Sequence, residues 1–329
     1  MRHYTRNANR DPSPERENCA FVADKRKEPE NMSTSEEARK EQPSTYFVQD
    51  RDNQSEFDRL RIQDQMITSK MGGVLPEQPE PQALRRVLDV GCGTGGWLLE
   101  VAKEYPTIEK LIGVDISAKM LAYARSQAEE QGVSERVEFH AMDALRMLEF
   151  PTGYFSLVNA RFSTSYLRTW DWPKFVSELA RVTRAGGIVR LTESGWLRGD
   201  SEILNRLANL CIEASFNAGH VFVEGDDTSV MAQLPDLLGR QGIQNIQTRD
   251  YELVLPAGTP EGESYREDLR HLFRVSLPFL RKWVGVLNDY EQLYQQMLEE
   301  TARPDFVGRW HLRTVWGTAP THRKTQHVV

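Results

Sequence analysis

Residues 87–96 read VLDVGCGTGG, an apolar run that breaks abruptly into four glycines. The run is typical of a buried strand, and residues 97–102 (WLLEVA) after the glycines have the composition of a helix. A strand, a tight glycine turn and a helix N-terminus bring backbone amides close to a nucleotide-like ligand. This stretch therefore predicts an α/β fold with a ligand site at the glycine turn.

The glycine turn fits two cofactor patterns. Gly91, Gly93 and Gly96 match the dinucleotide pattern G-x-G-x-x-G, whereas residues 89–95 match D-x-G-x-G-x-G, which points to S-adenosylmethionine. Asp89 would lie close to the pyrophosphate of a dinucleotide, and like charges in a cleft repel more strongly as the local dielectric constant falls. A ligand with a sulfonium and an ammonium group is instead attracted to this carboxylate. Asp89 therefore favours S-adenosylmethionine, and NAD stays open as the alternative.

Acidic residues also follow the next two predicted strands. Residues 110–115 (KLIGVD) end at Asp115, about 20 residues after the glycines, the distance at which a carboxylate meets ribose hydroxyls. Ile116 comes next and can lie flat against an adenine. Asp143 follows a short predicted strand over residues 136–141 and is placed to accept a hydrogen bond from the adenine amino group. Asp115 alone could be an ordinary strand-end or helix-capping acid, but the three acids together favour a cofactor site.

Five motifs carry a resemblance to a known family. They are VLDVGCGTG (87–95), GVDIS (113–117), AMDA (141–144), FSLVNARF (155–162) and LARVTRAGGIVRLTE (179–193). The chain resembles the class I S-adenosylmethionine-dependent methyltransferases that act on small molecules, such as the quinone-biosynthesis C-methyltransferases. The resemblance covers residues 46–320 in outline and is motif-specific over 84–193.

The resemblance implies a Rossmann-like α/β fold, with a seven-stranded, mostly parallel sheet, an antiparallel end strand and helices on both faces. It implies that Gly91 and Gly93 cradle the methionyl part of S-adenosylmethionine, Asp115 the ribose and Asp143 the adenine. Asn159 would hold the methionyl ammonium through its backbone or its side chain. The residues expected at the cofactor are Asp89, Gly91, Cys92, Gly93, Gly95, Asp115, Ile116, Met142, Asp143, Ala144 and Asn159.

Composition divides the chain into four parts. Residues 1–45 are charged with scarcely any large apolar side chains, so we expect a disordered tail, and residues 321–329 form a second, flexible tail. Residues 46–82 are predicted to be a helical cap and linker, with a helix over residues 55–66 in which Arg59 and Gln63 share one face. They are candidates for the cofactor carboxylate or the acceptor, or for an exposed charged face. Residues 83–320 form the methyltransferase domain, with a helical lid inserted at about 262–302.

The acceptor end of the site is predicted from an aromatic loop after the fourth strand. Loops at the carboxyl ends of parallel strands bind ligands in such sheets, so the loop favours an apolar or aromatic small molecule as methyl acceptor. The expected pocket residues are Phe162, Tyr166, Glu193, Trp196 and His271. Because a sulfonium leaving group needs no proton, we assign no catalytic residue. Glu193, His220 and His271 are candidate bases, for each of which a structural role is favoured.

Net charge, residue counts and residue spacing argue against several classes of protein. A net charge of −7 argues against nucleic-acid binding, and three scattered cysteines argue against a disulfide framework or a zinc site. The histidines show no metal-binding spacing, so we expect no metal, and no stretch is apolar enough to span a membrane. We expect a cytoplasmic enzyme of undetermined oligomeric state. The alternatives are a cofactor-binding regulator or adaptor without turnover, and an NAD-dependent oxidoreductase.

Overall fold

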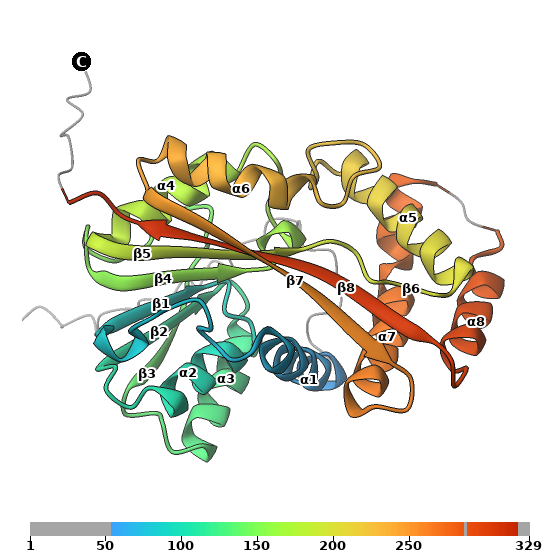
Figure 1. Cartoon of the computed structure of the whole chain (residues 1–329), viewed down its shortest axis with the longest axis horizontal. Coiled ribbons are helices and arrows are strands. Elements are labelled where there is room, and N and C mark those ends of the chain that lie inside the picture. Colours follow the sequence, from blue (N-terminus) through green and yellow to red (C-terminus); the bar gives the residue numbers. More distant parts are fainter. Residues whose placement is uncertain (1–53, 286–287, 322–329) are drawn as a thin grey trace, which may run out of the picture. The chain divides into compact units, whose positions relative to one another are not determined.

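A computed structural model of the chain describes residues 54–285 and 288–321 (Figure 1). The tail predicted over residues 1–45, and all but the first residue of the tail predicted over 321–329, lie outside the described residues.

One mixed sheet of eight strands forms the centre of the described chain. The strands are β1 (Arg86–Val90), β2 (Lys110–Asp115), β3 (Val137–Ala141), β4 (Phe155–Arg161), β5 (Thr183–Ser194), β6 (Arg198–Gly199), β7 (Gln244–Pro256) and β8 (Val307–Thr318). Their order is β3-β2-β1-β4-β5-β8-β6, and β7 pairs along β8. The first five strands are parallel, whereas β8 is antiparallel to β5, β6 and β7. The carboxyl ends of the parallel strands therefore meet at one edge of the sheet.

The predicted Rossmann-like, mostly parallel sheet is confirmed, but its far end differs from the prediction in two respects. The sheet has eight strands rather than seven because a two-residue strand, β6, pairs with Gly308 and Arg309 of β8. The antiparallel strand is also not the end strand. Because β5 and β7 both pair with residues 312–316 of β8, they lie on its opposite edges, and β7 is the outer strand.

Helices cover both faces of the parallel strands, as predicted. One face carries α2 (Gly96–Glu104) and α3 (Ala118–Glu130), and the other carries α4 (Trp172–Val182) and α6 (Ser229–Arg240). Neighbouring residues of β1 enter opposite cores: Val87 packs with α2 and α3, and Leu88 packs with α4 and α6. Burial on both faces explains why the central strands read as nearly continuous apolar runs.

A second helical layer packs against the β7–β8 pair where it extends beyond the parallel strands (Figure 1). It consists of α1 (Gln54–Met71), α5 (Glu202–Asn217), α7 (Pro260–Trp283) and α8 (Tyr290–Thr301). The last two helices occupy the predicted insertion. The cap helix α1 continues five residues beyond the predicted end at Met66, because Ile67 and Met71 are buried in this layer. Phe273 and Phe279 of α7 are core residues here.

Arg59 and Gln63 of α1 do not form the exposed charged face that was one of the alternatives. Arg59 forms an ion pair with Asp268 of α7, and Gln63 Nε2 donates a hydrogen bond to Asp268 Oδ2 at 2.5 Å. Asp268 is buried, and its side chain is 2% exposed. These contacts hold the cap helix on the inserted helix, so the two residues tie two parts of the fold together.

Candidate functional site

The glycine turn joins β1 to α2 in the conformation that its glycines allow. Gly91, Gly93 and Gly95 have φ angles of 74°, 53° and 76°, in the left-handed region that favours glycine. A Cβ atom on Gly91 would lie only 2.7 Å from the Tyr166 hydroxyl oxygen. The turn therefore brings bare backbone directly beside Tyr166, a residue predicted for the acceptor pocket.

Asp115 is held at the end of β2 by backbone amides. Its Oδ2 atom accepts a hydrogen bond from Gly93 N at 2.9 Å, and its Oδ1 atom accepts one from Ser117 N at 2.8 Å. A carboxylate oxygen can accept more than one hydrogen bond, so an acid held in this way is also suited to a ribose hydroxyl. Ile116 beside it is 61% exposed, which is unusual for so large an apolar side chain. An oriented acid next to a bare apolar surface suits a ribose joined to a flat base.

Asp143 lies beyond the neighbouring strand β3. Met142 N donates to the backbone oxygen of Asp115 at 3.0 Å, which fixes this segment beside β2. Asp143 Oδ1 accepts from Leu145 N at 2.9 Å, and its carboxylate forms an ion pair with Arg146 at 3.3 Å. The flanking Met142 and Ala144 are partly buried. The acid is thus oriented at the same edge of the sheet as Asp115.

Asp89 begins a chain of buried polar side chains. Asn159 Nδ2 donates to Asp89 Oδ1 at 2.7 Å, and Asn159 Oδ1 accepts from Arg190 Nη1 at 2.8 Å. Arg190 Nε in turn donates to Glu77 Oε1 at 2.6 Å, and both of these side chains are 1% exposed. The side chain of Asn159 is therefore buried and hydrogen-bonded through both its nitrogen and its oxygen, and its contact with the methionyl ammonium, through backbone or side chain, stays a prediction.

A second ion pair lies beside Asp89. Arg161 Nη2 of β4 is 2.6 Å from Asp64 Oδ1 of α1, and Asp64 also reaches Gly96, where a Cβ atom would clash with its carboxylate. Gly96 thus makes room for the cap helix at the N-terminus of α2. Burial raises the pKa of Asp89 to about 6, an effect that Asp64 increases and Arg161 opposes. Sequence patterns gave no indication of Asp64, Glu77 or Arg190 at this site.

Cys92 contributes its side chain to the packing below the turn. A Cβ atom on Gly113 would lie 2.8 Å from Cys92 Sγ and 2.6 Å from Phe139 Cδ1, so the thiol fits against β2 and β3 because Gly113 has no side chain. Burial raises the pKa of this thiol well above its usual value. The predicted cofactor contact of Cys92 is thus restricted to its backbone.

The acceptor-side residues gather around a short helical turn, η2 (Ser163–Ser165), that follows β4. Glu193 Oε1 accepts from Ser163 N at 2.6 Å, and Glu193 Oε2 accepts from the Thr164 hydroxyl at 2.8 Å. The Ser163 hydroxyl lies close enough to this carboxylate to lower its pKa, and the Tyr166 hydroxyl donates to Ser163 Oγ at 3.1 Å. A hydrogen-bonded chain therefore leads from Tyr166, at the glycine turn, to the buried Glu193.

The other predicted pocket residues are Phe162, Trp196 and His271. The Phe162 ring stacks on Trp310 with 6.0 Å between ring centroids, and Trp310 Nε1 donates to the backbone oxygen of Gly195. Trp196 N donates to Asp227 at 2.6 Å, and the side chain packs on the second helical layer. His271 is half-buried on α7. The structure thus joins Phe162, Tyr166 and Glu193 around η2, and places His271 on the inserted helix.

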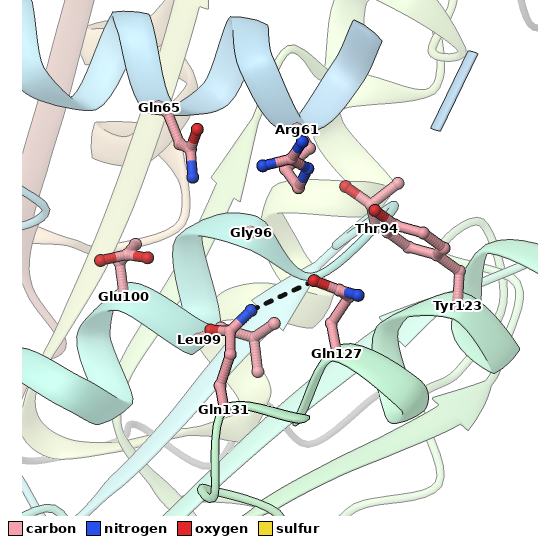
Figure 2. A pocket seen from close by; sticks show the side chains of 9 residues that line it. All are labelled: Arg61, Gln65, Thr94, Gly96, Leu99, Glu100, Tyr123, Gln127 and Gln131. Carbon is pink, nitrogen blue, oxygen red and sulfur yellow. Dashed lines mark hydrogen bonds between the residues drawn. The ribbon is translucent and has the colours of Figure 1, made fainter. Parts of the chain in front are cut away.

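A small pocket of about 50 Å³ lies behind the turn, between α1, α2 and α3 (Figure 2). Its lining residues are Arg61, Gln65, Thr94, Gly96, Leu99, Glu100, Tyr123, Gln127 and Gln131. None of the strand-end acids lines it, and its volume is too small for a nucleoside. We therefore place the candidate site at the carboxyl edge of the sheet and not in this pocket.

Two absences apply to residues 54–285 and 288–321. No helix in these ranges is both long and apolar enough to cross a membrane, and no group of three metal-ligating side chains gathers there.

The buried acids predict a pH-dependent stability. Burial raises the pKa of Glu193 to about 7 and that of Asp89 to about 6, so the folded chain keeps protons that the unfolded chain has lost. This stabilisation is complete below the unfolded pKa values and disappears as the pH rises through 6 and 7. We expect Glu193→Gln to reduce the fall in unfolding free energy between pH 5.5 and 8 by about 2 kcal/mol.

Urea unfolding of both proteins across this pH range measures the effect. His220, whose pKa is lowered by burial, acts in the opposite sense near pH 6, but it is unchanged between the two proteins and cancels in the difference. Parallel pH profiles of the two proteins would contradict the assignment.

Comparisons with known proteins agree with this geometry. Residues 87–187 match the family model described as "Methyltransferase domain". The chain is 39% identical to ajmaline N-methyltransferase of Rauvolfia serpentina over 114 residues (35% of this chain, 37% of that protein). It is 34% identical to aklanonic acid methyltransferase DauC of Streptomyces sp. (strain C5) over 127 residues (39% and 53%).

A third relative is demethylmenaquinone methyltransferase of Lactiplantibacillus plantarum, 36% identical over 100 residues (30% of this chain, 41% of that protein). The chain thus spans about a third to a half of the length of these three relatives. The segment matched by the family model contains the glycine turn and the three acids Asp89, Asp115 and Asp143. Residues 87–187 therefore belong to the methyltransferase domain family, and the chain carries a class I S-adenosylmethionine-dependent methyltransferase domain.

Proposed function

We propose that this chain transfers a methyl group from S-adenosylmethionine to a small-molecule acceptor. The observation that carries the proposal is the arrangement of Asp89, Asp115 and Asp143 after three adjacent parallel strands, around a glycine turn with left-handed backbone. Carboxylates at this turn complement a cationic, ribose-containing ligand and repel the pyrophosphate of NAD. The named relatives methylate small molecules according to their names, which supports the same class of acceptor here.

The residues present fit the donor. Gly91 has no side chain at the point where a Cβ atom would meet Tyr166, which leaves bare backbone for the methionyl part. Two backbone amides orient Asp115 at the end of β2, which suits this acid to the ribose hydroxyls, and Asp143 with the exposed Ile116 suits the adenine. When bound, S-adenosylmethionine supplies an electrophilic methyl group whose sulfur leaves without needing a proton.

The acceptor is expected to meet Tyr166, and Phe162 supplies an aromatic surface on the same turn. If the nucleophile is a hydroxyl or an amine, it must lose a proton as it gains the methyl group. The Tyr166 hydroxyl can take this proton while its own passes to Ser163 and the serine proton passes to Glu193. The products are then the methylated acceptor, the neutral thioether and a protonated Glu193, so charge and protons balance. A pKa of about 7 suits Glu193 to this role near neutral pH.

The test is turnover with a panel of phenols, secondary amines and carboxylic acids. Turnover is measured as the release of S-adenosylhomocysteine. We expect Tyr166→Phe to reduce kcat by about 100-fold, because general base catalysis contributes that much, with the affinity for S-adenosylmethionine unchanged. Thr164→Val is the matched control, since it removes a hydrogen bond to the same Glu193 carboxylate outside the Tyr166–Ser163 chain.

Titration calorimetry with S-adenosylmethionine and NAD tests the donor separately. Binding of NAD without binding of S-adenosylmethionine would refute the proposed function. Equal kcat in Tyr166→Phe and the unmodified protein would refute only the role of the tyrosine.

A further inference from the structure

Five charged side chains gather beside the glycine turn, and we call them the donor-side charge cluster: Asp64, Glu77, Asp89, Arg161 and Arg190. Arg190 pairs with Glu77 and Arg161 pairs with Asp64, each at 2.6 Å. Asp89 is 3% exposed and receives a hydrogen bond from the neutral Asn159. Three carboxylates thus share two guanidinium groups, and the ionised cluster carries a net charge of −1.

This charge is shielded from water. The side chains of Arg161 and Asp64 are 12% and 13% exposed, and those of Arg190 and Glu77 are 1% exposed. Both guanidinium groups lie over the buried ring of Trp97, at 5.7 and 5.9 Å from its centroid. Salt screens buried charges much less than exposed ones, so the cluster acts on a ligand at the turn almost without screening.

We propose that the donor-side charge cluster makes this site prefer the cationic methyl donor over its demethylated product. The inference rests on the proposed function. S-adenosylmethionine and S-adenosylhomocysteine share their adenine, ribose, ammonium and carboxylate, so the contacts to those groups cancel in the ratio of the two affinities. What remains is one methyl group and one positive charge. Because the sulfonium links the ribose to the methionyl chain, a ribose held by Asp115 and a methionyl chain at the glycine turn would place the sulfonium on the side of the turn that faces this cluster.

The net charge of −1, which equals the charge of Asp89, sets the expected size of the preference for S-adenosylmethionine over S-adenosylhomocysteine. Two unit charges separated by about 10 Å, at an effective dielectric constant of about 20, interact strongly enough to change an affinity ratio by about tenfold. Methyl transfer removes the positive charge from the ligand. The cluster therefore weakens product binding once the reaction has occurred.

Titration calorimetry at pH 8, above the pKa of Asp89, tests this inference with three probes. They are S-adenosylmethionine, S-adenosylhomocysteine and sinefungin, whose amine restores the positive charge without a sulfonium. Asp64→Asn and Glu77→Gln each remove one negative charge from the cluster, whereas Arg161→Gln removes one positive charge. Glu100→Gln is the control, because Glu100 pairs with Lys103 on the exposed side of α2.

We expect the unmodified protein to bind S-adenosylmethionine and sinefungin about tenfold more tightly than S-adenosylhomocysteine. The preference should shrink about tenfold in Asp64→Asn and Glu77→Gln, grow in Arg161→Gln and stay constant in Glu100→Gln. Opposite changes cannot come from a general loss of structure. If Glu77→Gln does not fold, Asp64→Asn still tests the expected decrease of the affinity ratio, and Arg161→Gln still tests the expected increase.

The outcomes separate the inference from the proposed function. An affinity ratio that is the same in all variants, or that moves in one direction in every variant, would overturn the inference while leaving the donor site in place. No binding of any probe to the unmodified protein would instead refute the proposed function.

Discussion

Replacement of Arg190 by alanine is expected to lower the free energy of unfolding by about 3–5 kcal/mol, the cost of breaking a buried ion pair from one side. The substitution leaves the Glu77 carboxylate buried at 1% exposure with its charge uncompensated, and removes a donor from Asn159. Glu77 lies in the linker between α1 and β1, and Arg190 lies on β5, so the ion pair attaches the linker to the sheet. Chemical unfolding monitored by circular dichroism measures the change.

Arg313 provides a matched comparison. It also pairs with a carboxylate, that of Asp250, at 2.7 Å, but on the exposed surface of β7 and β8, where the side chains are 27% and 50% exposed. Exposed ion pairs contribute about 0–1 kcal/mol, so Arg313→Ala is expected to cost no more than this. Equal losses in the two variants would show that burial of the Arg190–Glu77 pair has no special effect. The double variant Arg190→Met with Glu77→Leu should recover much of the loss, because it removes both charges of the pair and leaves neither partner uncompensated.

The largest effect on binding is expected from Asp115→Ala. This variant removes both acceptor oxygens offered to the ribose and the two backbone hydrogen bonds, from Gly93 and Ser117, that orient them. Charge-assisted hydrogen bonds contribute about 1.5–3 kcal/mol each, so we expect the affinity for S-adenosylmethionine to fall by at least about 100-fold. Titration calorimetry gives the affinity directly.

Asp236→Ala is the control for this variant, because Asp236 forms an exposed i,i+4 ion pair with Arg240 on α6. A 2′,3′-dideoxy analogue of S-adenosylhomocysteine tests whether Asp115 contacts the ribose hydroxyls. It should bind the unmodified protein and Asp115→Ala with similar affinities, since the hydroxyls that Asp115 would hold are missing. An unchanged affinity of Asp115→Ala for S-adenosylmethionine would remove the ribose assignment.

Local patterns in the sequence were sufficient to predict the parallel sheet and the donor edge. The glycine turn, Asp115 and Asp143 each lie at the end of a short apolar strand, and in a parallel sheet such ends share one edge. The cap helix was also predicted, but its end was placed too early, because burial of Ile67 and Met71 depends on helices far along the chain. Asn159 was assigned to the ligand because its strand-end position is compatible with that role. Only the register that places it beside Arg190 shows that its side chain is occupied.

By itself, the sequence predicted the proposed donor end of this protein, since the apolar run and the glycines of residues 87–96 specify a strand, a turn and the start of a helix. Tertiary structure alone decided which charges surround that turn. Arg190 meets Glu77 from 113 positions away, and Arg59 meets Asp268 from 209 positions away. Hydrophobic periodicity predicts which face of an element is buried, but it carries no information about which distant element supplies the partner of a buried charge. That choice depends on strand order and helix packing, and here it connects the linker and the cap helix to the methyl-donor site.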